Sequence, residues 1–281
     1  MRKRGCALAL VLLGSTGPVW AQLSPPNASG VAMGHLHYHV RDIEANERFW
    51  VALGGEATSL GATVVVKFPD VLVFLSEGES SGGTEGSVLN HMAFRVQSLD
   101  TIEAAGFEFE RPASSGVTSV FTPEGERIEL FDETATNLTF TLDDGFESPF
   151  AQRHNESLTV PIIAHHLHLY LAQGAVKEAR DWYATMFGGT PGMRWRYDAV
   201  DLPGINFNFS STPDTLAPTR GRMLDHIGLE VRNLETFCRE LEAKGVVFDV
   251  PYTRGALGFA SAFLTDPWGT YIELTEGLNG L

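Results

Sequence analysis

The feature of this sequence that most constrains its fold is a short motif that occurs four times. Each copy begins with His and has apolar residues one, three and five positions later; the copies are HLHYHV (35–40), HMAFRV (91–96), HLHLYL (166–171) and HIGLEV (226–231). In a β-strand, successive side chains face opposite sides of the sheet. The motif therefore predicts four equivalent strands, each with an apolar face for a core and a second face that begins with a histidine.

The segments that follow the motifs also repeat. A helical pattern ending in a glycine pair follows the first and third copies, as FWVALGG (49–55) and YATMFGG (183–189), and such glycines are typical of helix C-termini. Hairpin-like segments come next: KFPDVLVFL (67–75) matches DLPGINFNF (201–209), and PEGERIELFD (123–132) matches PWGTYIELTE (267–276). The chain thus divides into four units of strand, helix and further strands.

The four units are expected to form two α+β domains. Residues 31–135 hold the first two units and residues 161–277 the last two. Residues 136–160 are polar and show no periodicity, so we predict a linker there. A chain of 281 residues is long enough for two domains of moderate size.

The N-terminus predicts a secretory signal peptide, residues 1–21. Residues 2–4 are basic, residues 5–17 form a short apolar run, and Val19 and Ala21 supply the small residues of a cleavage site. The run is shorter than the roughly 20 residues that a membrane span needs. We therefore expect a secreted or periplasmic protein after signal cleavage, with no membrane partner.

Charge and cysteine content narrow the partners further. Without the signal, the chain carries 17 basic and 35 acidic residues, and nucleic-acid binding needs basic clusters, so no nucleic-acid partner is expected. Cys238 is then the single thiol, and it lies in an apolar helical stripe with Leu234, Phe237 and Leu241. We interpret it as a core residue and not as a nucleophile. The expected partner is a small-molecule substrate, and the expected state is a monomer or homodimer.

These repeats resemble the vicinal oxygen chelate superfamily, which includes glyoxalase I, bleomycin-resistance proteins and extradiol dioxygenases. The resemblance rests on the H-x-x-apolar-x-V openings, the FW…LGG and WY…FGG helix ends and the closing DPWGTYIEL, and it covers nearly all of residues 31–277. It implies four βαβββ units that form two cup-shaped domains with mixed sheets. Each cup of that superfamily holds one divalent metal.

The distribution of histidine agrees with a metal site. Eight of the nine histidines lie in the four strand openings, and only His154 lies elsewhere. Neutral imidazole is the commonest metal ligand in proteins. The closing strands offer a carboxylate in the same sequence context, Glu129 in RIELF and Glu273 in YIELT. This position matches the superfamily's carboxylate ligand.

The expected ligand sets are one per half of the chain: His35, His91 and Glu129, and His166, His226 and Glu273. Two histidines and one carboxylate leave coordination positions open for substrate oxygens, and they suit Zn, Mn, Fe or Ni. The second set is favoured as the active site, because its helix and the segment before Glu273 are more complete. Some superfamily members pair distant units, which leaves an alternative open: His35 with His226 and Glu273, and His166 with His91 and Glu129.

Three residues beside these sets are candidates for proton transfer. His37 and His168 each lie two positions after an expected ligand and so face the same side of the strand. Tyr252 is the third candidate. For the two histidines, a role in orienting the ligands is equally open. His165 is expected to point to the opposite face, and His39 has no assigned role.

Two further residues are candidates for substrate binding. Asn208 stands where glyoxalase I-type sites carry an additional acidic ligand, and its counterpart in the first half is Phe74. Arg254 is placed to meet an anionic or phenolic substrate.

The sequence as a whole predicts an exported, divalent-metal-dependent enzyme that binds a small substrate through two adjacent oxygens. The absence of an acidic fourth ligand favours an extradiol-dioxygenase-like reaction. That group also carries a non-ligand catalytic histidine, for which no clear match exists, so glyoxalase-like lyase or isomerase chemistry stays open. A non-catalytic cup that only binds a small molecule is the third alternative, and six ligand-type residues argue against it.

Overall fold

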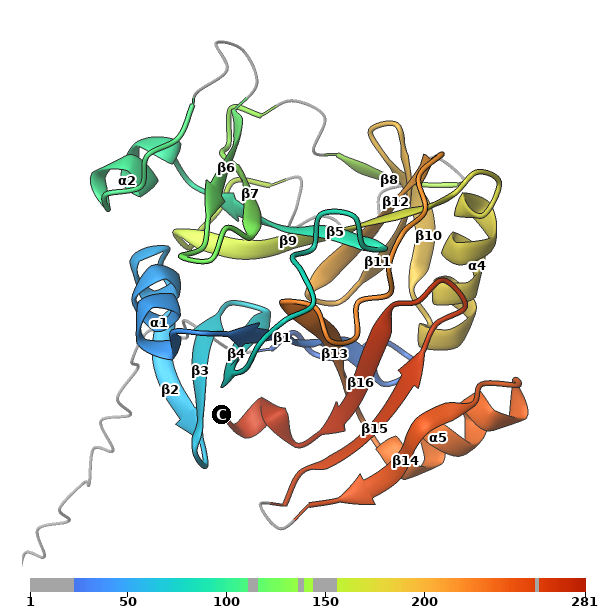
Figure 1. Ribbon diagram of the computed structural model, residues 1–281. Coiled ribbons are helices and arrows are strands. Elements are labelled where there is room, and N and C mark those ends of the chain that lie inside the picture. Colours follow the sequence, from blue (N-terminus) through green and yellow to red (C-terminus); the bar gives the residue numbers. More distant parts are fainter. Residues whose placement is uncertain (1–22, 111–115, 136–138, 144–155, 256–257) are drawn as a thin grey trace, which may run out of the picture.

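The strands form two eight-stranded mixed sheets, which confirms the α+β class (Figure 1). The computed structural model describes residues 23–110, 116–135, 139–143, 156–255 and 258–281. The predicted signal peptide, residues 1–21, and much of the predicted linker lie outside the described residues. In the part described, no helix is long and apolar enough to cross a membrane.

The first sheet, which we call the outer-unit sheet, takes its strands from the first and fourth units. Its order is β14 (Phe248–Arg254), β15 (Ala260–Thr265), β16 (Tyr271–Glu276), β13 (Leu224–Val231), β1 (Val31–Val40), β4 (Val71–Glu77), β3 (Thr63–Phe68) and β2 (Glu56–Leu60). The two units meet where β1 pairs antiparallel with β13.

The second sheet, which we call the inner-unit sheet, combines the second and third units. Its order is β6 (Val117–Phe121), β7 (Arg127–Phe131), β5 (Leu89–Val96), β9 (Ile162–Ala172), β12 (Ile205–Thr212), β11 (Tyr197–Leu202), β10 (Thr190–Arg194) and β8 (Phe140–Leu142). Here β5 pairs antiparallel with β9.

The two sheets do not coincide with the two halves of the sequence. Each sheet contains one unit from residues 31–135 and one from residues 161–277, so the units pair in a nested order. The segment between the halves is more than a linker, because β8 lies within residues 136–160 and extends the inner-unit sheet at its edge. The physical reason is that an unpaired strand edge at β10 is covered when β8 adds to it.

The apolar faces of both sheets share one core. All twelve apolar residues of the four motifs are buried in a single cluster, together with side chains from the helices α1 (Ile43–Ala52), α2 (Leu99–Ala104), α4 (Val176–Phe187) and α5 (Leu234–Ala243). The expected alternation of the strands is thus confirmed. Cys238 on α5 belongs to this cluster and is only 4% exposed, as predicted for a core thiol.

The two central strand pairs, β1–β13 and β5–β9, each contain two β-bulges, and these lie at equivalent positions in the two pairs. In each bulge one strand has an extra residue, and these residues are Gly34 in β1, Asp225 in β13, Asn90 in β5 and His165 in β9. Every one of them directly precedes a histidine that begins a repeated motif. A bulge turns the extra side chain away from strict alternation, so neighbours in sequence can reach the same face of the sheet.

Candidate metal centres

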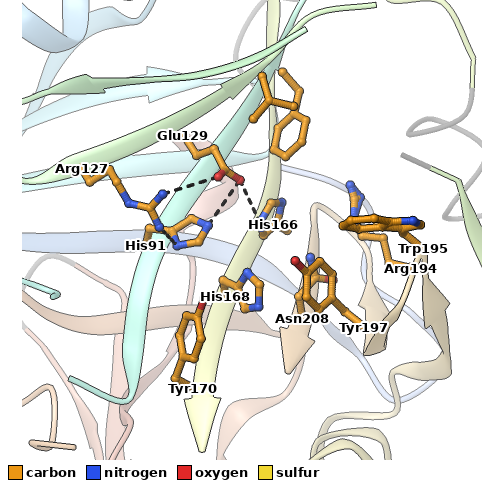
Figure 2. A pocket seen from close by; sticks show the side chains of 12 residues that line it. His91, Arg127, Glu129, His166, His168, Tyr170, Arg194, Trp195, Tyr197 and Asn208 are labelled. Carbon is orange, nitrogen blue, oxygen red and sulfur yellow. Dashed lines mark hydrogen bonds and ion pairs between the residues drawn. The ribbon is translucent and has the colours of Figure 1, made fainter. Parts of the chain in front are cut away.

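The concave face of the inner-unit sheet brings His91, His166 and Glu129 together. Glu129 lies beside Ala93 on the parallel strands β7 and β5, and Ala93 lies opposite His166 on β9. His91 is two residues before Ala93 and faces the same side. Three neighbouring strands therefore supply one ligand-type side chain each (Figure 2). We call this face the inner-unit cup.

The concave face of the outer-unit sheet, the outer-unit cup, repeats this layout. Glu273 lies beside Gly228, and Gly228 lies opposite His35, with His226 two residues before Gly228. The ring of His35 rests directly on Gly228: a Cβ atom there would come within 2.0 Å of the ring. Any residue larger than glycine at position 228 would therefore clash with the His35 ring in its present position.

The ligand-type atoms of each cup converge on one carboxylate oxygen. Glu273 Oε2 lies 3.0 Å from His35 Nε2 and 3.2 Å from His226 Nε2. Glu129 Oε2 lies 3.3 Å from His91 Nε2 and 3.6 Å from His166 Nε2. Metal bonds of about 2.1 Å at tetrahedral or octahedral angles separate neighbouring ligand atoms by about 3.0 to 3.4 Å. Three of the four distances lie in this range and the His166 distance of 3.6 Å lies just outside it, so the spacing in both cups is close to that around a first-row divalent metal.

A second observation also fits a metal in the inner-unit cup. His91 Nε2 is buried and makes no hydrogen bond of proper geometry within the described part of the chain, although it faces the Glu129 carboxylate. A buried polar atom without a partner is costly, and a bound cation would satisfy it. Two imidazoles and a carboxylate are also a donor set that such metals take.

The bulged residues orient the ligand histidines. His226 donates from Nδ1 to Asp225 Oδ1 at 2.6 Å, His91 contacts Asn90 Oδ1 through Nδ1 at 2.8 Å, and the Nδ1 atoms of His166 and His165 lie 2.9 Å apart. A proton held on Nδ1 leaves the Nε2 lone pair free for a metal. The fourth bulged residue is Gly34, which has no side chain, and His35 Nδ1 is buried without a partner among the described residues.

Burial and hydrogen bonding shift the pKa values of the ligand-type side chains in different directions. Burial lowers the pKa of His35 and of His91, so both are neutral near pH 7. Burial alone raises the pKa of Glu273, but hydrogen bonds from His226 and His35 outweigh it, and its pKa lies below the usual range. Burial likewise opposes protonation of His226, yet the bonds to Asp225 and Glu273 give a net raised pKa.

A further histidine stands beside each set, as the sequence predicts. His37 lies opposite His226, and His168 lies opposite His91. Each can supply a nitrogen that lies within 4.8 Å of the nitrogens of the two ligand-type histidines of its cup. Burial lowers the pKa of His37 to about 3 and that of His168 to about 2, so both are neutral.

A serine holds each of these two histidines. His37 Nε2 is 2.7 Å from Ser76 Oγ, and His168 Nε2 is 2.8 Å from Ser210 Oγ. The sequence analysis did not single out either serine. Both lie two residues beyond the position occupied by Phe74 in one cup and Asn208 in the other.

The two cups differ in what surrounds the ligand-type residues. The inner-unit cup holds a cavity of about 290 Å³ lined by Arg127, Arg194, Tyr170, Trp195, Tyr197 and Asn208 beside its histidines and Glu129 (Figure 2). Asn208 Oδ1 in this cavity is buried and without a hydrogen-bond partner in the described ranges. The cavity of the outer-unit cup is about 190 Å³ and mostly apolar, with Leu60, Phe74, Phe259, Phe263 and Leu278 in its wall.

The structure corrects the grouping expected from the two halves of the sequence. His35 does not meet His91 and Glu129, and His166 does not meet His226 and Glu273; the alternative sets are the ones brought together. The cause is the nested pairing of the units. The favoured second-half site therefore does not exist as a single cluster.

Three other expectations need correction. Tyr252 and Arg254 lie on β14, the edge strand of the outer-unit sheet, where Arg254 donates to the Tyr252 hydroxyl; neither residue lines either cavity. His165 does not point to the opposite face, because it is the bulged residue of β9 and contacts His166 and Arg194.

Sequence analysis missed several residues of the inner-unit cup. Arg127 lies two positions before Glu129 on β7, so strand alternation from Glu129 would have found it. Trp195 and Tyr197 come from the β10–β11 hairpin, whose place beside this cup depends on the pairing of β12 with β9. No local signal gives that pairing.

Comparisons with known proteins relate the second half of the chain to a family in sequence. Residues 163–274 match the model of the Glyoxalase/Bleomycin resistance protein/Dioxygenase superfamily. No curated protein matches the chain in sequence.

Solved structures of similar fold cover most of the chain. Glyoxalase I from Zea mays aligns with a TM-score of 0.61 at 13% identity, over 89% of this chain and 94% of that one. A candidate dioxygenase from Bacillus subtilis aligns with a TM-score of 0.59 at 13% identity, over 91% of this chain and 86% of that one. Residues 163–274 thus match the glyoxalase/bleomycin resistance/dioxygenase superfamily in sequence, and the chain as a whole is similar to these solved structures in fold.

Proposed function

We propose that this protein is a divalent-metal-dependent enzyme that acts on a small substrate through two adjacent oxygens, and that its reaction is extradiol-dioxygenase-like. The observation that carries the proposal is the set of His91, His166 and Glu129 on the wall of an open cavity. Two histidines and one carboxylate on one face of a metal are the donor set of non-haem Fe(II) oxygenases.

His91 Nε2, His166 Nε2 and Glu129 Oε2 are the atoms that would hold the metal. When bound, such an ion supplies Lewis acidity and, if it is iron, a means of activating dioxygen. The balance of ring cleavage is simple: both atoms of one dioxygen molecule enter the opened ring of a catechol, so no external reductant is needed.

Neighbouring residues of the inner-unit cup suit a catechol-type substrate. Asn208 Oδ1, which is buried and lacks a partner in the described part of the chain, is able to accept a hydrogen bond from a substrate hydroxyl. His168 is neutral, lies opposite His91 and is held by Ser210, so its ring can form a hydrogen bond with a substrate oxygen.

The inner-unit cup is the better candidate for the active site. Its cavity is larger and carries several polar groups, whereas the cavity of the outer-unit cup is smaller and largely apolar beyond its ligand-type residues. Ligand sites typically combine a cavity with a few convergent polar groups. The outer-unit cup is then a second metal centre whose role is to hold the first and fourth units together.

Glyoxalase-like isomerase chemistry is the second candidate. The fold aligns with glyoxalase I from Zea mays over most of both chains, and the two cups have the same ligand layout. Isomerisation moves a proton between neighbouring carbons, which requires a base beside the metal. Glu129 is the residue that would act as this base, since His168 has its pKa lowered to about 2.

We also propose that the chain is exported after cleavage behind Ala21, on the sequence features of residues 1–21. Expression of the full sequence in a bacterium and mass measurement of the periplasmic protein tests this. A mature chain that begins at Gln22 is expected, and an uncut cytosolic chain would contradict export.

The reaction is tested with protein reconstituted separately with Fe(II), Mn(II), Ni(II) and Zn(II). With Fe(II), catechols are expected to cause oxygen uptake and a ring-cleavage chromophore in equal amounts, and His91→Ala is expected to abolish both. Turnover of methylglyoxal with a thiol, without oxygen uptake, would favour the isomerase instead. Protein that retains no metal after reconstitution would overturn both and favour a binding protein.

A further inference from the structure

We propose that the inner-unit cup binds a planar aromatic acid, whose acid group pairs with Arg127 and whose ring lies against Trp195 and Tyr197. The preferred ligand class is a catechol that carries a carboxylate. This inference names the substrate class of the proposed enzyme and therefore rests on the proposed function.

Two arginines line this cavity: Arg194 is buried against His165, and Arg127, which is partly exposed, is the one placed to meet an anion. Its side chain is 35% exposed, and it lies on the cavity wall two residues before Glu129. One terminal nitrogen donates to Asn90 Oδ1 at 2.8 Å. The other lies 3.5 Å from Glu129 Oε1, a contact that Figure 2 shows. Guanidinium binds a carboxylate through two parallel hydrogen bonds. An arginine whose position is fixed by neighbouring side chains, and whose guanidinium is partly exposed to the cavity, is therefore suited to bind a carboxylate.

The contacts of His91 link Arg127 to the metal. His91 Nδ1 lies within hydrogen-bonding distance of both Asn90 Oδ1 and the Arg127 guanidinium. The amide oxygen requires a proton on Nδ1, whereas the guanidinium requires a lone pair there. Both contacts cannot hold at once for a single tautomer.

A metal on His91 Nε2 resolves this conflict in one direction. The ring proton must then be on Nδ1, where it donates to Asn90, and Arg127 loses its acceptor on His91. The Arg127 N–H that loses this acceptor faces an open cavity, where it can donate a hydrogen bond to an anion. Binding of an acid should therefore be stronger in the metal-loaded protein than in the metal-free one.

Trp195 points to an aromatic ligand. It lies in the β10–β11 turn with a φ angle of +52°, a conformation that a bulky residue rarely adopts, and its side chain is 50% exposed. Neither burial nor backbone preference explains a tryptophan at this place, and strained residues of this kind cluster at ligand sites. Tyr197 stands next to it with a ring-centre distance of 5.7 Å, and both line the cavity.

The outer-unit cup provides an internal comparison. Among the residues that the structure describes, no arginine or lysine lines its cavity, and the position of Asn208 is taken there by Phe74. A neutral or apolar ligand suits that cup better than an acid. We therefore expect the inner-unit cup, and not the outer-unit cup, to prefer an acid over a neutral ligand.

The test measures binding by calorimetry to protein loaded with Zn(II), which does not support oxygen chemistry. The ligands are 3,4-dihydroxybenzoate and catechol, which differ only in the carboxylate. We expect the acid to bind at least about tenfold more tightly than catechol, which corresponds to about 1.4 kcal/mol. Arg127→Gln should remove this difference, Arg127→Lys should keep part of it, and Trp195→Leu should weaken both ligands.

Arg239→Gln is the matched control, because it removes an exposed arginine on α5 that pairs with Glu235 and lines neither cavity. It should leave the preference for the acid unchanged. Metal-free protein should lose most of that preference. Circular dichroism of each variant establishes that it is folded.

The outcomes separate this inference from the proposed function. Equal affinity for the two ligands, unaffected by Arg127→Gln, would overturn the inference and leave the enzyme proposal intact. An equal preference for the acid without metal would overturn the link between the metal and Arg127. Loaded protein that binds neither ligand would overturn the proposed catechol chemistry itself.

Discussion

Asp225 and His226 are adjacent in sequence, yet both side chains lie on the same face of β13, where His226 donates from Nδ1 to the Asp225 carboxylate at 2.6 Å. The β-bulge at Asp225 makes this contact possible. The same device places Asn90 beside His91 and His165 beside His166. Three of the four ligand-type histidines thus receive their orienting partner from the residue immediately before them.

Asp225→Ala is expected to weaken metal binding in the outer-unit cup by about 10- to 100-fold, the usual effect of removing a partner of a ligand histidine. Asp225→Asn should cost less, because it reproduces the amide that Asn90 offers to His91. Competition between the protein and a coloured chelator for Zn(II) measures both. Glu240→Ala removes an exposed carboxylate on α5 and serves as the control; equal losses in all variants would contradict the role of Asp225.

The nested pairing of units predicts which histidine variants behave alike. His35→Ala and His226→Ala should each remove one and the same metal, and His91→Ala and His166→Ala should each remove the other. Elemental analysis should give two metals per wild-type chain and one in every single variant. His35→Ala combined with His226→Ala should still retain one metal, whereas a pairing by sequence halves would leave none.

Gly228→Ala is expected to damage the outer-unit cup selectively. The added methyl group would come within 2.0 Å of the His35 ring and force it out of place. Overpacking of this kind costs about 1 to 3 kcal/mol, and the metal of that cup should be lost as well. Denaturant unfolding and metal analysis measure the two effects. Gly280→Ala, where an added Cβ meets nothing within 4 Å, is the control and should be neutral.

Cys238 provides a pH-dependent measure of folding. Burial raises the pKa of its thiol from about 9 to about 11. Because the folded pKa lies above the unfolded one, this contribution to the free energy of unfolding is complete below pH 9 and is lost as the pH rises through 11. At pH 8 iodoacetamide should therefore modify the folded chain lacking residues 1–21 far more slowly than the unfolded chain.

Comparison with Cys238→Ala isolates this effect. The difference in unfolding free energy between the two proteins should shrink between pH 9 and pH 11. A difference that stays constant over this range, or fast alkylation of the folded protein, would show that the thiol is accessible and that its pKa is not raised.

Much of this fold could be predicted from local pattern. The alternation of His35-Leu36 and its three counterparts fixes which face of each strand enters the core, because the side-chain period of a strand is two. The Ile-Glu-Leu context of Glu129 and Glu273 identified the third ligand-type residue of both cups. These features could be predicted because each depends on only a few consecutive residues.

The arrangement of the sites could not be predicted in the same way. Whether His35 meets His91 or His226 depends on which unit edge pairs with β1, and both partner strands have the same pattern. The side of His165 depends on a bulge, which shifts the register by one residue and leaves no mark in strand periodicity. Arg254 and Tyr252 were misplaced because the position of an edge strand relative to a cup is a property of the whole sheet.

The nested order of the units also has a consequence for how the chain folds. The inner-unit sheet joins two consecutive units, so its central contacts span a modest stretch of chain. The outer-unit sheet joins the first unit to the last, and β1 must wait for β13 before its edge is covered. Contacts of such long sequence separation form slowly, and an uncovered strand edge invites aggregation. During synthesis the outer-unit sheet should therefore assemble last, with the first unit as the part of the nascent chain most in need of protection.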